Sequence, residues 1–300
     1  MVKPNFFVVG ALKSGTTAMC EYLGRHPEIF IPSSKEINYF GSDMGVRLPR
    51  LTEAQYLEWH YSEATGEKRV GDGSVWYLYT QFAAAEIREF APDARIVIML
   101  RNPVAALYSL HSQFLYTGDE DLQDFGEAMA AEPDRKAGRR MPPGTSFPEM
   151  LYYREVASYT DQVRRFHDQF GPDQVEVHLF DDFVRDTGAV YRSILRFLGV
   201  DPGFTTRFQV VNPNKEIRNR GIQDFLKTPP AWIRKMARSV MPGYERRERL
   251  RRRMIGWNTR NPARPAMDPS LKERLTLEFA PEVKRLETLL GRDLSRWRSP

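Results

Sequence analysis

The sequence predicts an α/β fold: a single domain with a mostly parallel central sheet flanked by helices. Two short apolar runs, Phe6–Leu12 and Arg95–Leu100, have the length and composition of buried strands. Each run is followed directly by a segment with helical character. Strands that alternate with helices in this way form parallel sheets covered on both faces.

The rest of the chain continues this alternation. We expect helices over Thr16–Leu23, Asn102–Phe114, Tyr152–Phe170, Gly188–Leu198 and Pro269–Leu290, and a further strand over Val175–Phe180. Asn102 and Pro103 form an N-cap and first-turn pair. A glycine follows most of the predicted helices and serves as their stop.

The domain is expected to span residues 1–300, because 41% hydrophobic residues suffice for a sizeable core and no linker divides the chain. Two segments look like additions to the sheet. Residues 118–149 are polar and rich in glycine and proline, which predicts a mobile loop or a short helical lid on the acceptor side. Residues 222–257 are expected to form a basic helical insertion.

The net charge of +5 is concentrated in one place. Residues 234–253 hold nine basic and two acidic residues, a local charge of +7, which leaves 35 basic against 37 acidic residues, or −2, elsewhere. Because the excess positive charge is confined to this one segment, it does not indicate a nucleic-acid-binding protein. Three interpretations of it stay open: a solvated helical face, a docking surface for an acidic acceptor or carrier, or a helix on an anionic membrane surface.

The cysteine and histidine content predicts a cytoplasmic protein without a metal site. The single cysteine, Cys20, excludes an intrachain disulfide. None of the five histidines pairs with another at i,i+4, so no zinc site is expected. The sequence shows no secretory signal and no apolar run long enough to span a membrane. If the protein contacts the inner face of the membrane peripherally, the segment expected to do so is 234–253.

A glycine-containing loop, Gly10–Thr17, lies between the first predicted strand and the first predicted helix. Backbone amides at a helix N-terminus bind anions, and the hydroxyls of Ser14, Thr16 and Thr17 can donate to phosphate oxygens. This succession of strand, glycine-containing loop and helix predicts a phosphate-loop (P-loop kinase-like) architecture. Its lysine is Lys13, inside the loop, whereas nucleotide triphosphatases have lysine at the place of Thr16. The alternative is a plain glycine turn.

On these residues the sequence resembles the sulfotransferase family. The run Lys13–Thr17 matches the family's K-x-G-T-T signature, and Arg101, which ends a predicted strand, is followed eight residues later by Ser109. The resemblance continues at 197–200 and 289–297, and covers most of the chain. It implies the donor 3′-phosphoadenosine 5′-phosphosulfate, the product adenosine 3′,5′-bisphosphate, and no metal.

The resemblance also implies roles for residues of this chain. The 5′-phosphosulfate would be bound by Lys13, Ser14, Gly15, Thr16 and Thr17, and the 3′-phosphate by Arg101 and Ser109. The family's third nucleotide loop is loosely matched at 257–262, where Arg260 is the first choice for a 3′-phosphate contact and Arg264 the next. For Arg101 and Ser109 the alternatives are a surface arginine at a strand end and an ordinary helix serine.

The expected general base is Glu36. Heparan-sulfate-type and many bacterial members carry a glutamate before an aromatic pair, and Glu36 precedes Tyr39 and Phe40 in this way. Its neighbour Lys35 is expected to balance its charge or to help hold the sulfonate, and the alternative is a solvated Lys35–Glu36 pair on a loop. The resemblance to the heparan-sulfate branch does not extend to Asn38 and Gly73, where some of those enzymes have histidine and lysine.

Three functions from different classes are carried forward. The first is a sulfotransferase that moves a sulfuryl group in line to a hydroxyl or amine of a small-molecule, glycan or lipid acceptor, with Glu36 as base and Lys13 on the leaving group. The second is a nucleotide-dependent kinase on the same loop, which Thr16 and Arg101 argue against. The third is a non-catalytic nucleotide- or membrane-binding protein. His111, two residues after Ser109, competes with Glu36 as base.

Overall fold

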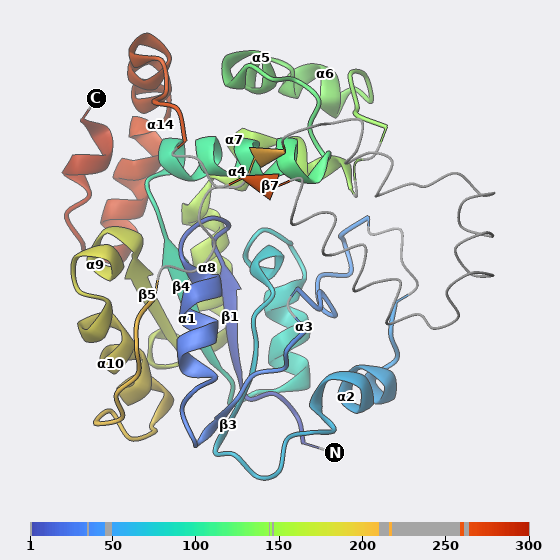
Figure 1. Cartoon of the computed structure of the whole chain (residues 1–300), viewed down its shortest axis with the longest axis vertical. Helices are drawn as coiled ribbons and strands as arrows, with labels where there is room; N and C mark the ends of the chain where they lie inside the picture. Colours follow the sequence, from blue (N-terminus) through green and yellow to red (C-terminus); the bar gives the residue numbers. More distant parts are fainter. Residues whose placement is uncertain are drawn as a thin grey trace.

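The computed structural model describes residues 2–34, 36–45, 50–143, 145, 147–209, 216–217, 259–260 and 264–299, with the pairs 216–217 and 259–260 given by their backbone only. The predicted α/β fold is confirmed: a five-stranded parallel sheet of order β2-β3-β1-β4-β5 lies between helices (Figure 1). The basic segment 234–253 and the predicted insertion 222–257 lie outside the described residues.

The strands of the main sheet are β1 (Phe6–Gly10), β2 (Ile29–Phe30), β3 (Arg69–Asp72), β4 (Arg95–Leu100) and β5 (Val175–Leu179). A separate antiparallel pair is formed by β6 (Glu216–Ile217) and β7 (Thr259–Arg260). The central position belongs to β1, which pairs in parallel with both β3 and β4. The carboxyl ends of these strands therefore meet at one edge, where ligands bind in open α/β sheets.

The α-helices are α1 (Thr16–Leu23), α2 (Glu53–Tyr61), α3 (Ala83–Phe90), α4 (Pro103–Thr117), α5 (Phe125–Ala130), α6 (Glu132–Lys136), α7 (Tyr153–Val156), α8 (Tyr159–Phe170), α9 (Phe180–Arg185), α10 (Thr187–Leu198) and α14 (Pro269–Leu290). Short 3₁₀ helices cover η1 (Val75–Leu78), η2 (Pro148–Leu151), η3 (Pro172–Gln174) and η4 (Ser295–Arg298). Among the described helices, none combines the length and apolar character needed to cross a bilayer.

Side chains alternate across β1 and so build a core on each face of the sheet. Phe7 and Val9 pack into a large core with α3, α4, α8 and α14, whereas Phe6 and Val8 pack into a smaller core with α1, α9 and α10. All five residues of β1 are buried. This two-sided burial explains why the first strand reads as a continuous apolar run.

Two predicted helices have different bounds in the structure. The helix expected over Tyr152–Phe170 is two helices, α7 and α8, with a break at Ala157 and Ser158. The backbone N–H of Thr160, in the first turn of α8, donates to the Glu282 side chain of α14 at 2.7 Å. A side chain that is distant in the sequence thus provides a hydrogen-bond acceptor for an N–H that has no partner within the helix. Helix α4 continues to Thr117, and Gly118 ends it in the left-handed conformation with φ 75°.

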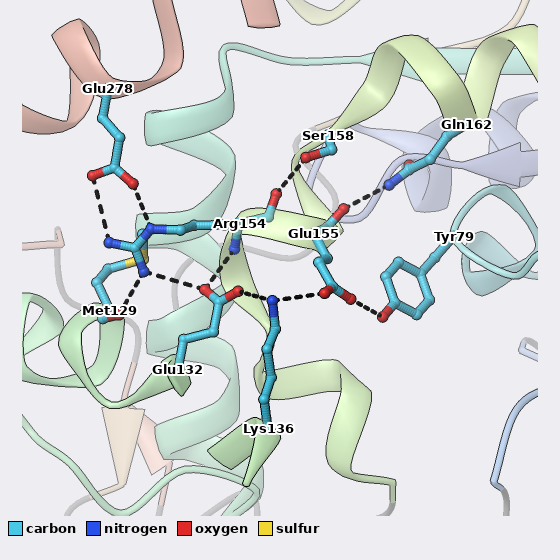
Figure 2. A network of polar contacts seen from close by, with 9 residues as sticks. All are labelled: Tyr79, Met129, Glu132, Lys136, Arg154, Glu155, Ser158, Gln162 and Glu278. Atoms are coloured by element: carbon cyan, nitrogen blue, oxygen red, sulfur yellow. Dashed lines mark hydrogen bonds and ion pairs between the residues drawn. The ribbon is translucent and has the colours of Figure 1, made fainter. Parts of the chain in front are cut away.

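The segment 118–149 contains the short helices α5 and α6. A chain of ion pairs and hydrogen bonds ties α6 to α7 and α14 (Figure 2). Lys136 lies 3.0 Å from Glu132 and 2.6 Å from Glu155. Arg154 joins Glu132 at 3.2 Å and also pairs with Glu278 of α14.

A fully buried ion pair anchors the start of this segment. The guanidinium of Arg135 on α6 donates to both carboxylate oxygens of Glu120, at 2.9 and 2.6 Å, and neither side chain is exposed. Tyr153 adds a third hydrogen bond at 2.9 Å. Burial raises the pKa of Glu120, but the hydrogen bonds from Arg135, the Leu122 N–H and Tyr153, together with the charge of Arg135, outweigh burial, so the net pKa lies below its usual value.

Replacing Arg135 with methionine is expected to lower the free energy of unfolding by about 3–5 kcal/mol, because Glu120 would be left buried without its cation. The matched control is Arg139→Met, which breaks an exposed pair with Asp134 and should cost at most about 1 kcal/mol. Urea titration measures both. Because the folded-state pKa of Glu120 is lowered, the pair's contribution is present at neutral pH and is lost as the pH falls through that pKa. Equal losses in the two variants would contradict this account.

Candidate active site

The loop between β1 and α1 presents backbone amides without intrahelical partners. Gly15 is the N-cap of α1, has φ 86°, and carries no side chain to cap the first turn. A Cβ at this position would lie 3.0 Å from the Phe183 ring, so both conformation and space favour glycine. The amides of the first turn, together with the helix dipole, thus form an anion-binding position.

This loop borders a cavity of about 610 Å³ at the carboxyl edge of the sheet. Lys13 follows β1, Trp76 follows β3, Arg101 follows β4 and Phe180 follows β5, and all four line the cavity. Of the site residues predicted from the sequence, those that line it are Lys13, Gly15, Thr16, Thr17, Glu36, Arg101, Ser109 and Arg264. Segments more than 200 residues apart in the chain therefore contribute to one site.

One end of the cavity gathers two arginines around a serine. Arg264 donates to Ser109 Oγ at 3.0 Å and to Ser112 Oγ at 3.1 Å. Burial lowers the pKa of Arg101, and the positive charge of Arg264 lowers it further. Burial also lowers the pKa of Arg264. Two half-buried guanidinium groups that repel each other would be stabilised by a bound anion, which makes this end suited to a phosphate.

Lys13 connects this end to the loop. Its carbonyl oxygen accepts a hydrogen bond of 3.1 Å from Arg101, and its ammonium lies 3.5 Å from Gln113 Oε1 on α4. The residue itself has φ 60°, the left-handed conformation. Three residues at four-residue steps on α4 all line the cavity: Ser109, Gln113 and Thr117. Residues with this spacing lie on one face of a helix, so this face of α4 forms one wall of the cavity.

Glu36 reaches the cavity from a strained loop. Its φ is 57°, and Oε2 accepts a hydrogen bond of 3.0 Å from the backbone N–H of Val75 at the start of η1. Glu36 and Lys13 thus both line the same cavity. Lys35, the expected partner of Glu36, lies outside the described residues.

Two other predicted residues, Ser14 and His111, do not line the cavity, and the side chain of a third, Arg260, is not described. Ser14 is fully buried and its hydroxyl donates to the carbonyl of Leu12 at 3.3 Å, so its side chain braces the loop and does not line the cavity. Arg260 lies in β7 opposite Glu216, and its side chain is outside the described part. His111 is buried, contacts the Leu122 carbonyl at 2.8 Å, and does not line the cavity; burial lowers its pKa.

Several cavity residues were not predicted from the sequence. Trp76, Gln113, Thr117, Asp119 and Phe180 all line it. The four-residue spacing from Ser109 to Gln113 and Thr117 is the signal that could have identified two of them. The other three depend on where η1, the end of α4 and the start of α9 lie in space.

Gly73, where some heparan-sulfate enzymes have lysine, lies against α1. A Cβ at this position would be 2.8 Å from the sulfur of Cys20. Cys20 is buried and so fills the space into which a side chain at 73 would extend. Within the described residues, no group of three or more His, Cys, Asp or Glu side chains comes together to hold a metal ion.

Two comparisons with known proteins cover nearly the whole chain. The model of the sulfotransferase domain family matches residues 3–287. A solved structure described as a sulfotransferase from Alicyclobacillus acidocaldarius is similar over 100% of both chains, with a TM-score of 0.74 and 31% identity.

Curated relatives match shorter stretches. Membrane-associated sulfotransferase kil1 of Dictyostelium discoideum is 33% identical over 34% of this chain and 21% of its own length. Heparan sulfate glucosamine 3-O-sulfotransferase 6 of Mus musculus is 31% identical over 37% of this chain and 31% of its own length. The chain therefore spans at most about a third of the length of these relatives. Because the family model matches nearly all of the chain and the full-length structural likeness agrees with it, the chain belongs to the sulfotransferase family.

Proposed function

We propose that the protein transfers a sulfuryl group from 3′-phosphoadenosine 5′-phosphosulfate to an acceptor hydroxyl or amine by in-line transfer, with Glu36 as general base. One observation carries the proposal: a single cavity is lined by Lys13, by Glu36 and by the arginine pair Arg101 and Arg264. The lysine and carboxylate suit group transfer, and the arginines suit a second, non-reacting phosphate.

The residues present fit the two anionic groups of this donor. The first-turn amides of α1, with Thr16 and Thr17, would hold the 5′-phosphosulfate, while Arg101, Ser109 and Arg264 would hold the 3′-phosphate. The donor supplies an activated sulfuryl group and leaves as adenosine 3′,5′-bisphosphate. Lys13 stabilises the negative charge that develops on the leaving group. These cationic side chains take the part that a metal would otherwise play, so we propose no metal.

Glu36 is proposed to take the proton of the acceptor. The Val75 N–H fixes one carboxylate oxygen, Oε2, at 3.0 Å and so orients the group at the cavity wall. A positioned carboxylate within hydrogen-bond reach of the acceptor is the arrangement that general-base catalysis needs.

The acceptor is proposed to enter beyond the lysine. Successive cavity residues four apart on α4 are separated by about 6 Å along the helix axis. Gln113 is next to Lys13, so Thr117, with Asp119 close by, lies one turn farther from Ser109. This polar end suits a hydroxyl-bearing small molecule, glycan or lipid headgroup. The segment 118–149, which follows Thr117 directly, is proposed as the lid on this side.

A phosphoryl-transfer enzyme is the second candidate, and one observation counts against it. The acidic residue at the end of β3, Asp72, does not line the cavity and is fully used by hydroxyl donors. A kinase on this architecture needs an acidic magnesium ligand at a strand end, and neither of the acidic residues that line the cavity, Glu36 and Asp119, ends a strand. Against a non-catalytic nucleotide-binding protein stands Glu36, because a carboxylate would repel an anion bound in the cavity that it lines.

The location and further partners stay proposals. A cytoplasmic protein agrees with a single, buried cysteine. Contact with a membrane surface or an acidic partner through 234–253 concerns residues outside the described part of the chain.

Alanine at Arg101 or at Ser109 is expected to weaken binding of adenosine 3′,5′-bisphosphate much more than binding of adenosine 5′-phosphate. The reason is that both residues are assigned to the 3′-phosphate, and a charge-assisted hydrogen bond is worth roughly 1.5–3 kcal/mol, about tenfold or more in affinity. Isothermal calorimetry measures both nucleotides. Arg95→Ala, at the opposite end of β4, is the control and should change neither. Equal losses for the two nucleotides would refute the assignment.

A further inference from the structure

The loop that carries Glu36 is held in an unfavourable backbone conformation. Glu36 and Asn38 have φ of 57° and 51°, in the left-handed region that residues other than glycine adopt rarely. Such conformations persist only where the surrounding structure determines them, and they are concentrated at functional sites. The groups that hold this loop therefore also set the position of the Glu36 carboxylate.

Two buried hydroxyls bind consecutive amides of this loop. The N–H of Asn38 donates to Ser74 Oγ at 3.1 Å, and the N–H of Tyr39 donates to the Tyr77 hydroxyl at 3.0 Å. Both Ser74 and Tyr77 are fully buried. A third bond, from Val75 N–H to Glu36 itself, comes from the same short segment. The base loop is thus bound by residues 74, 75 and 77.

One carboxylate fixes the orientation of both hydroxyls. Ser74 Oγ donates to Asp72 Oδ1 at 2.6 Å, and the Tyr77 hydroxyl donates to Asp72 Oδ2 at 3.0 Å. A hydroxyl has one proton, so each group that donates to Asp72 must present a lone pair to the loop amide. Burial raises the pKa of Asp72, and the hydroxyl donors oppose this rise. Asp72 does not line the cavity, so it has no direct role at the reacting atoms.

We infer that Asp72, Ser74 and Tyr77 form a positioning cluster that holds Glu36 at the wall of the cavity. The cluster acts through the loop backbone: Asp72 orients the two hydroxyls, and the hydroxyls fix the amides of Asn38 and Tyr39. This inference rests on the proposed function, since it presumes that Glu36 is the base. The positioning cluster is expected to affect the reaction step and not the binding of the donor.

The chain offers a closely matched control for a test. Tyr56 also donates its hydroxyl to Asp72 Oδ2, at 2.8 Å, and is also fully buried, but it has no hydrogen bond to the base loop among the described residues. Tyr77→Phe and Tyr56→Phe therefore remove the same group from the same carboxylate oxygen. Only the first also releases the Tyr39 amide.

The experiment compares Ser74→Ala, Tyr77→Phe and Tyr56→Phe. Three quantities are measured: the initial rate of sulfur-35 transfer from labelled donor to an extract of the protein's own cells, the affinity for adenosine 3′,5′-bisphosphate, and the thermal midpoint. We expect Ser74→Ala and Tyr77→Phe to lower the rate about tenfold to a hundredfold, because small displacements of a reacting group have effects of this size. Bisphosphate affinity should stay within about twofold of wild type. Tyr56→Phe should lower the thermal midpoint as much as Tyr77→Phe does and leave the rate near wild type.

A double variant separates this inference from the base assignment. In the Glu36→Gln background, adding Ser74→Ala should lower the rate by less than about twofold, because residues that act through one group are not additive. If Glu36→Gln is inactive but Tyr56→Phe and Tyr77→Phe lose rate equally, the positioning cluster is overturned and the base assignment stands. A fully active Glu36→Gln enzyme would overturn the base assignment and this inference with it.

Discussion

Replacing Lys13 with alanine is expected to lower the rate of sulfuryl transfer by about 10³-fold, which is the effect of removing one group that stabilises developing charge. Lys13 lies on the loop between β1 and α1, where its ammonium contacts Gln113 Oε1 at 3.5 Å, and it is not one of the buried core residues. The fold and the thermal midpoint should therefore be unchanged. The rate is measured with sulfur-35 donor, and the fold by circular dichroism.

The control for this variant is Lys3→Ala, which removes an exposed lysine that pairs with Glu53 away from the cavity. It should retain the wild-type rate. Donor-dependent transfer near the wild-type rate in Lys13→Ala would rule out the assigned role of the loop lysine.

The second large effect is expected for Glu36→Gln. Glutamine keeps the size of the side chain and removes its proton-accepting ability, so the rate should fall about 10²–10⁴-fold while bisphosphate affinity changes little. In the wild-type enzyme the rate should fall as the pH is lowered and the base becomes protonated. This acidic limb should disappear in Glu36→Gln. The measurement is the rate of transfer as a function of pH.

Two further variants complete this comparison. Glu21→Gln alters an exposed carboxylate paired with Arg25 and should leave the rate unchanged. His111→Ala removes a buried ring that contacts Leu122 and does not line the cavity, so it should affect stability more than the chemical step. A Glu36→Gln enzyme with full rate beside an inactive His111→Ala enzyme would move the base to His111.

The parts of the fold that the sequence predicted are those in which local signals agree. The strand β1, its glycine loop and α1 are consecutive in the chain, as are β4, Arg101 and α4. Apolar runs, N-cap residues and terminal glycines mark these boundaries locally. For this reason the α/β architecture and the order of its main elements follow from the sequence alone.

Elements that depend on distant partners were not predicted. Strand β3 contains Gly71 and Asp72, residue types that are depleted in strands. Gly71 is needed there because a Cβ would lie 2.3 Å from the Phe6 ring of the neighbouring strand. The break between α7 and α8 likewise depends on Glu282 of α14, more than 100 residues away.

The residues of the site also differ in whether a local sequence pattern predicts them. The loop, Glu36, Arg101 and Ser109 stand in short motifs, and the structure brings them to one cavity. Arg264 was only a second choice because a motif does not reveal which arginine of a basic stretch returns to Ser109. The support of Glu36 by Asp72, Ser74 and Tyr77 connects segments 36 to 39 and 72 to 77, and no local pattern reports such a connection.

The most direct test of the central claim is a transfer measurement. Purified protein is incubated with 3′-phosphoadenosine 5′-[³⁵S]phosphosulfate and an extract of its own cells, with Lys13→Ala and Glu36→Gln in parallel, and the labelled products are separated and identified. We expect a discrete labelled product with the wild-type protein, formed together with adenosine 3′,5′-bisphosphate, and almost none with either variant. Equal labelling by all three proteins, or no transfer by a wild-type protein that binds the bisphosphate, would contradict the account.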